Sequence, residues 1–280
     1  MNNVNNQFNE LDIPLDDRSK ALRKAILDIF RCSRRGHLAP AFSLLEIFRV
    51  LYDDILNYQA DKPDWANRDR CILSKGHGCL ALYVLLADKG FFPKPALQTF
   101  CQHNSFLGGH PEYAKIPGVE ASTGSLGHGL SIAIGMALNA RIRQQQQRIF
   151  VVLGDGETNE GSVWEAALSA GKHQLDNLTV IIDYNKLQSY GSTFEVQNLE
   201  PYADKWQSFG FHVDEINGHD VKALQSTLQK TTAQKPQLVI CHTVKGKGIA
   251  ETENNLAWHH KSNIKDEDID RLEKNLFKNV

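Results

Sequence analysis

From Ile149 onward, short apolar runs alternate regularly with segments of helical pattern. The runs expected to be strands are 149–153, 178–183, 211–216 and 237–241, and the helical segments between them are 160–172, 201–208 and 220–232. Strands that alternate with helices pair in parallel, and strands that are apolar nearly throughout are buried on both faces. The sequence therefore predicts an α/β fold, with a parallel sheet covered by helices on both faces.

The first half of the chain is expected to add helices and one strand to this sheet. Helical periodicity begins at Ser19, the expected N-cap of the first helix, and returns over 43–56, 79–88 and 125–141. A brief buried strand is predicted over 70–73, and an amphipathic helix over 265–275. Residues 1–17, rich in Asn and Asp, predict a loose N-terminal arm. No linker rich in Gly, Pro and Ser divides the remainder, so residues 18–280 are expected to form a single domain.

Charge and hydropathy argue against two classes of partner. The 280 residues include 31 Lys and Arg against 33 Asp and Glu, a formal net charge of -2, which leaves no basic face for nucleic acid or an anionic membrane. The longest apolar run, 79–87, is less than half of what a bilayer core requires, and the N-terminal sequence lacks the regions of a signal peptide. We therefore expect a cytoplasmic protein with no nucleic-acid or membrane partner.

The loops that follow the predicted strands are the places to look for a ligand, because open parallel sheets bind ligands beyond the carboxyl ends of their strands. Gly154, Asp155 and Gly156 follow the strand 149–153 and precede a helix. Glycine lets the backbone approach a phosphate, and a helix N-terminus offers free N–H groups to an anion. A carboxylate beside such an anion makes chemical sense when a divalent cation lies between them, so Asp155 is expected to bind a metal.

The end of the next strand strengthens this interpretation. Asn185 follows the strand 178–183, and one βαβ crossover separates it from Gly156. Adjacent parallel strands would bring Asp155 and Asn185 together. Their two oxygen atoms, completed by a backbone carbonyl and two phosphate oxygens, suit octahedral Mg²⁺ or the more flexible Ca²⁺.

With a Gly-Asp-Gly turn, a helix and an Asn at the end of the next strand, the chain resembles thiamine-diphosphate enzymes, and more closely the N-terminal half of transketolases. The resemblance runs over almost the whole chain and implies the thiamine-diphosphate-binding fold of the diphosphate type. It is carried, in family order, by Arg35-Gly36-His37, Ser74-Lys75-Gly76-His77-Gly78, Gly109-His110-Pro111-Glu112, Thr123-Gly124-Ser125-Leu126-Gly127, residues 154–161, residues 183–187, Asn217-Gly218-His219-Asp220, residues 243–248 and Trp258-His259.

This resemblance implies roles for the matching residues. The metal ligands would be Asp155, Asn185 and the Leu187 carbonyl, and the groups around the diphosphate would be Gly156, His77, Lys245 and His259. Gly124 and the backbone of Leu126 would meet the aminopyrimidine ring, and Ser125, Glu157 and Glu160 are counted with the cofactor-binding residues. The donor-sugar contacts would be His37, His110 and His259, since imidazole, with a pKa of about 6.5, exchanges protons near neutral pH.

Several positions depart from the family pattern or match no role in it. Leu38 stands where many members have Pro, and His128 stands where Gln is common. His260 follows His259 directly; we assign the catalytic role to His259 because it comes straight after Trp258. The histidines with no matching role are expected to be structural: His173, His212, His219 and His242.

The resemblance also implies a partner. In the family the cofactor lies between two domains, and the second, pyrimidine-type domain supplies a glutamate that protonates the aminopyrimidine ring. Complete transketolases are more than twice as long as this chain, so we expect a C-terminal, pyrimidine-domain partner subunit, with two copies of each chain. The expected enzyme is a two-chain transketolase that moves a two-carbon ketol unit from a ketose or ketose phosphate to an aldose.

Three alternatives stay open. The cofactor subunit of a two-chain 2-oxoacid dehydrogenase shares the Gly-Asp-Gly and Asn motif, but a 2-oxoacid has no row of hydroxyls for the histidines to contact. Nothing in the sequence argues against a specialised two-chain transferase that acts on an unusual aldehyde. A non-catalytic paralogue would have little reason to keep Asp155, Asn185 and the histidines.

Overall fold

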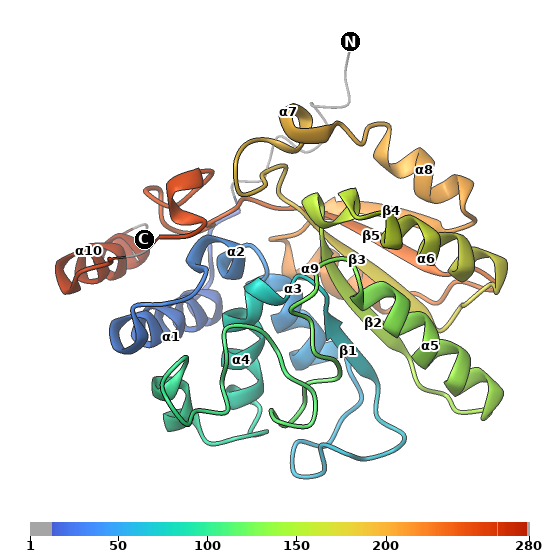
Figure 1. Ribbon diagram of the computed structural model, residues 1–280, viewed down its shortest axis with the longest axis horizontal. Helices are drawn as coiled ribbons and strands as arrows, with labels where there is room; N and C mark the ends of the chain where they lie inside the picture. Colours follow the sequence, from blue (N-terminus) through green and yellow to red (C-terminus); the bar gives the residue numbers. More distant parts are fainter. Residues whose placement is uncertain (1–12, 262, 279–280) are drawn as a thin grey trace.

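The structure, a computed structural model, describes residues 13–261 and 263–278. Five parallel strands form one sheet in the order β1-β2-β3-β5-β4, and helices lie on both sides of it (Figure 1). The strands are β1 (Arg70–Leu73), β2 (Ile149–Gly154), β3 (Leu178–Tyr184), β4 (His212–Asn217) and β5 (Gln237–His242). The predicted α/β fold, with a covered parallel sheet, is confirmed.

Short helices and turns connect the strands and cover the sheet. The α-helices are α1 (Asp17–Ser33), α2 (Leu38–Phe42), α3 (Leu45–Val50), α4 (Cys79–Asp88), α5 (Gly129–Ile142), α6 (Gly161–Lys172), α7 (Thr193–Gln197), α8 (Tyr202–Ser208), α9 (Val221–Leu228) and α10 (Asp266–Lys278). One π-helix, η2 (Leu51–Ile55), follows α3, and the 3₁₀ helices are η3 (Gly76–Gly78), η4 (Lys94–Thr99), η5 (Gly156–Asn159) and η6 (Leu256–Trp258). Within the described ranges, no helix is both long and apolar enough to cross a membrane.

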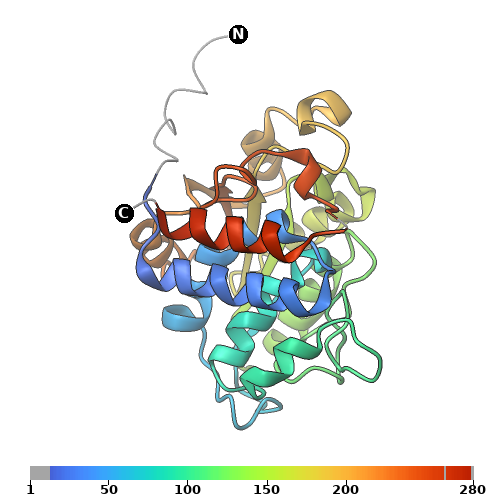
Figure 2. The same cartoon turned by 90° about the vertical axis from the view of Figure 1, so that its left-hand side faces the viewer.

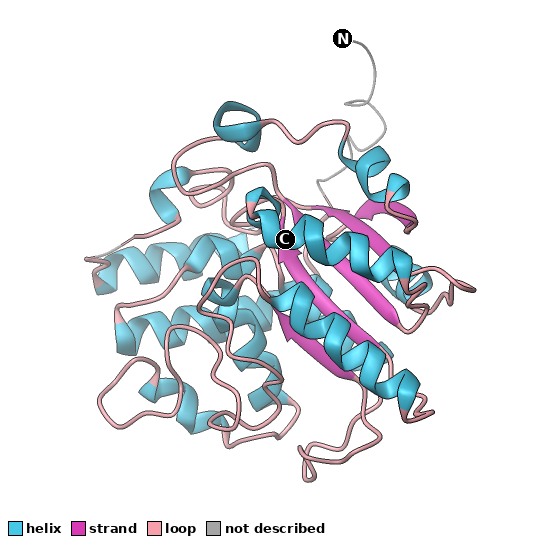
Figure 3. Cartoon of the chain, turned by 45° about the vertical axis from the view of Figure 1, so that its right-hand side comes forward, coloured by secondary structure: helices cyan, strands magenta, loops and turns pink. Residues whose placement is uncertain are grey.

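Alternate residues of the central strands enter two separate apolar cores. In β2, Val151 and Leu153 pack with α5 and α6, which cross one face of the sheet in Figure 3, whereas Phe150 and Val152 join the core of α1, α3 and α4. All four side chains are fully buried. Burial of such a side chain contributes about 1.5–3 kcal/mol, so both faces favour apolar residues, and this explains the nearly continuous apolar runs.

The strand ends are level at the carboxyl edge of the sheet. Gly154 at the end of β2 pairs with Asp183 of β3, and Asp183 pairs with Cys241 of β5. The loops that follow these three strands therefore leave the sheet at one place. β4 is the edge strand beyond β5, and its side chains are only partly buried.

Helices α1 and α10, from the two ends of the described chain, lie side by side (Figure 2). Arg31 of α1 forms an ion pair of 2.9 Å with Asp270 of α10. The prediction that Ser19 caps α1 is wrong: Asp16 is the N-cap, and its carboxylate accepts a hydrogen bond of 2.9 Å from the Ser19 N–H. Residues 1–12 of the predicted arm lie outside the described residues, and the division at residue 18 stays a prediction.

Three predicted helices have different bounds in the structure. The helix expected over 43–56 is α3 followed by the π-helix η2, which ends with a hydrogen bond of 2.8 Å from the Leu56 N–H to the Leu51 carbonyl. The helix expected from Ser125 begins at Gly129, because Gly127 takes a left-handed φ of 81° that no α-helix continues through. The helix expected over 220–232 ends at Leu228.

Candidate active site

A cavity of about 330 Å³ opens at the carboxyl edge of the sheet, a size usual for small-molecule sites, which span roughly 300–1,000 Å³. It lies where the loops after β2, β3 and β5 meet the segments before α2 and α4 (Figure 1). Its lining consists of His37, Pro40, Lys75, His77, His110, Leu126, Gly154, Asp155, Gly156, Glu157, Asn185, Leu187, Gln188, Ser189, Lys245, His259 and His260. Most residues predicted from the sequence to act together therefore share one cavity.

Asp155 and the segment after β3 are joined by hydrogen bonds. One carboxylate oxygen of Asp155 accepts from the Gly156 N–H at 2.7 Å, and the other accepts from the backbone N–H of Lys186. The side-chain oxygen of Asn185 accepts from the Leu187 N–H at 3.1 Å. The expected convergence of the ends of β2 and β3 is thus present, with both predicted side-chain ligands lining the same cavity.

The electrostatics around Asp155 suit a bound cation. Burial and the nearby Asp183 carboxylate raise the pKa of Asp155 to about 6, so the Gly156 and Lys186 N–H groups and Lys75 compensate its negative charge only in part. The three predicted donors, Asp155, Asn185 and the Leu187 carbonyl, offer hard oxygen atoms of the kind that Mg²⁺ and Ca²⁺ prefer. Among the described residues, no three His, Cys, Asp or Glu side chains are grouped for a metal.

Beside these oxygen atoms, the cavity also offers a cation and unused nitrogen atoms to an anion, and the Leu187 carbonyl is shared between the predicted metal site and Lys245. The Lys245 ammonium donates to the carbonyls of Leu187 and Gln188, at 3.1 Å each, and burial and the nearby Lys75 lower its pKa to about 8. Two buried nitrogen atoms, His259 Nδ1 and Gln188 Nε2, have no hydrogen-bond partner among the described residues. Because a buried polar atom without a partner costs about 1–3 kcal/mol, these atoms fit the oxygen atoms of a bound phosphate.

Four histidines crowd one wall of the cavity. The ring centroids of His37, His77 and His259 lie 5.5–5.8 Å apart, and His37 Nε2 lies 2.9 Å from Nδ1 of His260. Burial, with the nearby His260 and His110, lowers the pKa of His37 to about 4, and burial with Lys245 lowers that of His259 to about 2. Burial and Lys75 place the pKa of His77 well below its ordinary value. All three rings are therefore neutral near pH 7.

These depressed values predict a loss of stability in mild acid. The unfolded chain binds protons at the three histidines below pH 6.5, whereas in the folded chain His37 binds its proton only near pH 4 and His259 only near pH 2. The free energy of unfolding therefore falls steadily as the pH is lowered from 6.5. Asp155, whose pKa is raised, acts in the opposite direction but is one group against three. His77→Asn is expected to flatten this fall, by up to about 1.4 kcal/mol per pH unit. Urea unfolding at several pH values measures this change in the free energy of unfolding. The control His173→Asn, at an exposed site, should show the same dependence on pH as the wild type.

Some predicted cofactor residues lie beside the cavity rather than in its lining. Gly124 and Ser125 are exposed, and neither lines the cavity, whereas Leu126 does. Glu160 is also exposed and packs against Gly127.

Glu157 lines the cavity, but its carboxylate is already hydrogen-bonded within the chain. It accepts from the N–H groups of Gly127 and Gly154, at 2.9 and 3.0 Å, and from the Ser74 hydroxyl. Glu157 thus connects the segments that contain Ser74, Gly127 and Gly154 through hydrogen bonds.

A buried ion pair beneath the cavity was not predicted from the sequence. Asp183 accepts hydrogen bonds of 2.6 Å from the Lys75 ammonium and from the Ser43 hydroxyl, and another from Thr243. Burial alone would raise the pKa of Asp183, but the Lys75 charge and these hydrogen bonds outweigh it and hold the pKa below its usual value. The sequence did contain a signal for this ion pair, because Lys75 and Asp183 both lie in motifs of the family pattern. The cavity-lining residues Pro40, Gln188 and Ser189 also were not predicted, and the sequence contains no signal for them.

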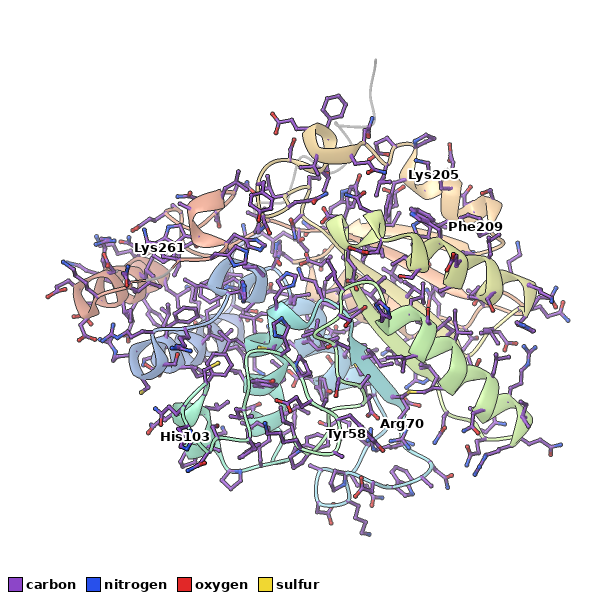
Figure 4. All side chains as sticks on the ribbon, in the orientation of Figure 1. Tyr58, Arg70, His103, Lys205, Phe209 and Lys261 are labelled. Carbon is purple, nitrogen blue, oxygen red and sulfur yellow. The ribbon has the colours of Figure 1, made fainter. Side chains whose placement is uncertain are left out.

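Trp258 and the residues after it close one side of the cavity. Trp258 is buried, and the Lys261 ammonium, labelled in Figure 4, lies 5.1 Å from its ring centroid. His259 follows and is 7% exposed, and its Nε2 lies 3.1 Å from the Ser189 hydroxyl. His260 is exposed and also reaches the cavity.

Comparison with known proteins decides the family. The family model described as "Transketolase, thiamine diphosphate binding domain" matches residues 16–279. An apulose-4-phosphate transketolase subunit of Phocaeicola vulgatus is 42% identical over 248 residues, which cover 88% of this chain and 88% of that protein. The chain belongs to the transketolase family. The predicted resemblance is therefore confirmed.

Two further transketolases show how much of the family fold the chain contains. The "6-deoxy-6-sulfo-D-fructose transketolase subunit SqwG" of Clostridium sp. strain MSTE9 is 39% identical, over 90% of this chain and 93% of that protein. The solved transketolase from Leishmania mexicana superposes with a TM-score of 0.85 at 32% identity, and the match covers 92% of this chain. It covers 40% of that transketolase chain, so the match accounts for less than half of the longer protein.

Proposed function

We propose that this chain is the N-terminal, cofactor-binding subunit of a two-chain transketolase. The enzyme would move a two-carbon ketol unit from a ketose or ketose phosphate to an aldose acceptor. The observation that carries the proposal is that Asp155 and Asn185 line one cavity together with Lys245, His77 and His259. Family membership supports the reaction class, and relatives of similar length that are named as transketolase subunits support the two-chain organisation.

The cofactor would be thiamine diphosphate held with Mg²⁺, or Ca²⁺. Asp155, Asn185 and the Leu187 carbonyl would bind the metal. His77, Lys245 and His259 would receive the diphosphate together with the Gly156 N–H. A side chain does not fit at Gly156, because its Cβ would lie 2.7 Å from Gln188. When bound, thiamine diphosphate supplies a nucleophilic carbon and an electron sink, the chemistry that ketol transfer needs.

The chain's histidines would act on the donor sugar. His37, His110 and His259 line the cavity, and neutral imidazoles can accept a hydroxyl proton and return it later. The low pKa values of His37 and His259 keep both rings unprotonated at neutral pH, which is the state that a proton acceptor needs. A sugar phosphate bound nearby would raise these values toward neutrality by its negative charge.

A second polypeptide would complete the site, with two copies of each chain in the assembly. Near the cavity, Ser189 is followed by an apolar, exposed segment in which Tyr190 is 94%, Phe194 72% and Val196 49% exposed. Such large apolar side chains, gathered within seven residues, are typical of a protein interface. The partner would carry the pyrimidine-type domain and would exclude water from the cofactor. The cytoplasmic location stays a prediction.

Family membership disfavours a 2-oxoacid dehydrogenase, and the intact site disfavours a non-catalytic paralogue. The specialised two-chain transferase gains support, because two relatives carry the names of apulose-4-phosphate and 6-deoxy-6-sulfo-D-fructose transketolases. This second candidate uses the same residues of the present chain and differs only in the donor and acceptor.

The test is reconstitution. The chain, mixed with thiamine diphosphate and MgCl₂, is expected to show no measurable ketol transfer from a panel of ketose phosphates. Addition of a pyrimidine-domain polypeptide encoded beside it should restore transfer, because the resemblance implies that this domain supplies the glutamate that protonates the aminopyrimidine ring. Formation of the released aldose phosphate can be followed with a coupled assay. Robust turnover by the single chain would contradict the proposal, and so would an inactive but stable complex of the two chains.

A further inference from the structure

Behind the cavity, Arg23, Glu46 and His219 form a buried polar chain that no predicted role explains. Their exposed fractions are 0%, 1% and 3%. The Arg23 guanidinium donates to both oxygen atoms of Glu46, at 2.6 and 3.0 Å, and Nδ1 of His219 lies 2.8 Å from Glu46 Oε2. They come from α1, α3 and the loop after β4, and none lines the cavity.

The contacts of His219 fix its tautomer. Its Nε2 accepts a hydrogen bond of 2.9 Å from the Val244 N–H, so the ring proton must sit on Nδ1 and point at Glu46. Burial alone would raise the pKa of Glu46, but the charge of Arg23 and the bond to His219 outweigh it and hold that pKa far below its usual value. The carboxylate is therefore ionised, and the ring is a fixed acceptor for the residue before Lys245.

Arg23 reaches the same loop and also the segment of His37. Its Nε donates to the Lys247 carbonyl at 2.7 Å, and its Nη2 donates to the Phe42 carbonyl at the end of α2 at 3.0 Å. His37 is the N-cap residue of α2. The loop and α2 also touch directly, through a hydrogen bond of 3.1 Å from the Gly246 N–H to the Ala39 carbonyl. This network of Arg23, Glu46 and His219 therefore contacts both the loop that contains Lys245 and helix α2, which begins after His37.

A stabilising role alone does not account for such a network. A buried ion pair carries a desolvation penalty that often equals its Coulombic gain, and apolar residues of similar size commonly do as well or better. The charged network provides fixed geometry: Arg23 donates to the carbonyls of Phe42 and Lys247, and His219 accepts from the Val244 N–H, while Glu46 holds both side chains in place. Residues that orient a ligand-binding group from behind change affinity or activity by about 10–100-fold when they are lost.

We propose that Arg23, Glu46 and His219 are positioning residues, which fix the Lys245 loop against the helix of His37 and so set the width of the cavity. This proposal rests on the proposed function only in taking Lys245 to be a diphosphate contact. It reassigns His219 from a purely structural histidine to one that acts through Val244.

Two substitutions of His219 separate the two hydrogen bonds of its ring. Gln places an acceptor where Nε2 stands and can keep the bond from Val244, whereas Asn places its polar atoms nearer Nδ1 and loses that bond. His212→Asn is the matched control, because His212 is exposed on β4 and touches Asp214 rather than the loop. Two measurements are made: hydrogen exchange of residues 243–248 on the full chain, and binding of thiamine diphosphate in the presence of MgCl₂ by the chain together with its partner.

We expect His219→Asn to speed exchange of the Val244 amide about 10-fold or more and to weaken thiamine diphosphate binding by about 10–100-fold. His219→Gln should keep most of both properties, and His212→Asn all of both. If Asn and Gln lower the unfolding midpoint equally while exchange and binding stay at wild-type values, the residue is merely structural and the proposal is overturned. If the wild-type chain with its partner binds no thiamine diphosphate, the proposed function fails, whereas unchanged exchange in His219→Asn by itself overturns the positioning role.

Discussion

Asp155→Ala is expected to abolish Mg²⁺-dependent binding of thiamine diphosphate while leaving the chain folded. The carboxylate is the only charged group among the three predicted metal ligands, and without it Asn185 and the Leu187 carbonyl offer neutral oxygen atoms alone. An affinity loss of at least about 100-fold is expected, since charge supplies much of the attraction of Mg²⁺ to hard ligands. The fold should survive because the same carboxylate, buried with a raised pKa, is costly in the absence of a cation.

Calorimetric titrations with thiamine diphosphate, with and without MgCl₂, measure this effect. Asp204→Ala, on the exposed side of α8, is the matched control and should bind as the wild type does. Unfolding midpoints of both variants establish that the fold is intact. Wild-type affinity in Asp155→Ala, with its dependence on MgCl₂ preserved, would remove Asp155 from the metal site.

The sheet was predictable because each strand carries its own signal. The runs in β2, β3 and β5 are apolar on both faces. A helix follows each of the first two, and strands that alternate with helices in this way pair in parallel. Once strands 149–153 and 178–183 are adjacent and parallel, Asp155 and Asn185 must meet. Their convergence thus follows from topology, and no knowledge of side-chain rotamers is needed to predict it.

The positions of helix ends were less predictable, since they depend on single residues. Gly127 takes a left-handed conformation that glycine adopts without strain, and this delays α5 to Gly129. A Cβ at this position would also lie 2.6 Å from Glu160. Asp and Ser are both preferred N-cap residues, so the local sequence alone does not decide whether Asp16 or Ser19 caps α1. The bulge that ends α3 as a π-helix has no comparable sequence signal.

The polar interior of the site was the least predictable part. Glu157 stands in the Gly-Asp-Gly segment and invites a cofactor role, but its carboxylate is consumed by Gly127, Gly154 and Ser74. Asp183 was interpreted only as the end of a strand, although it is the acceptor around which Lys75 is held. Buried polar groups are defined by partners distant in sequence, and their partners become visible only when the loops are assembled.

His259→Ala is expected to lower turnover by about 100- to 10,000-fold, the range in which a general acid or base contributes, and to change cofactor affinity much less. The ring is 7% exposed, its Nδ1 has no partner among the described residues, and Ser189 holds its Nε2. A buried nitrogen left free in the cavity is placed to meet a ligand. His260, which is exposed and already engaged with His37, lacks this property, so His260→Ala should lose less activity.

Both constants are measured on the chain with its partner, turnover at saturating thiamine diphosphate and affinity from its half-saturating concentration. His103→Ala is the control, because His103 is exposed and outside the cavity lining (Figure 4). A loss of affinity with turnover preserved at saturating thiamine diphosphate would make His259 a diphosphate contact alone, since an interaction made equally before and during the reaction alters binding and leaves turnover unchanged. A larger loss in His260→Ala than in His259→Ala would transfer the catalytic role to the neighbouring ring.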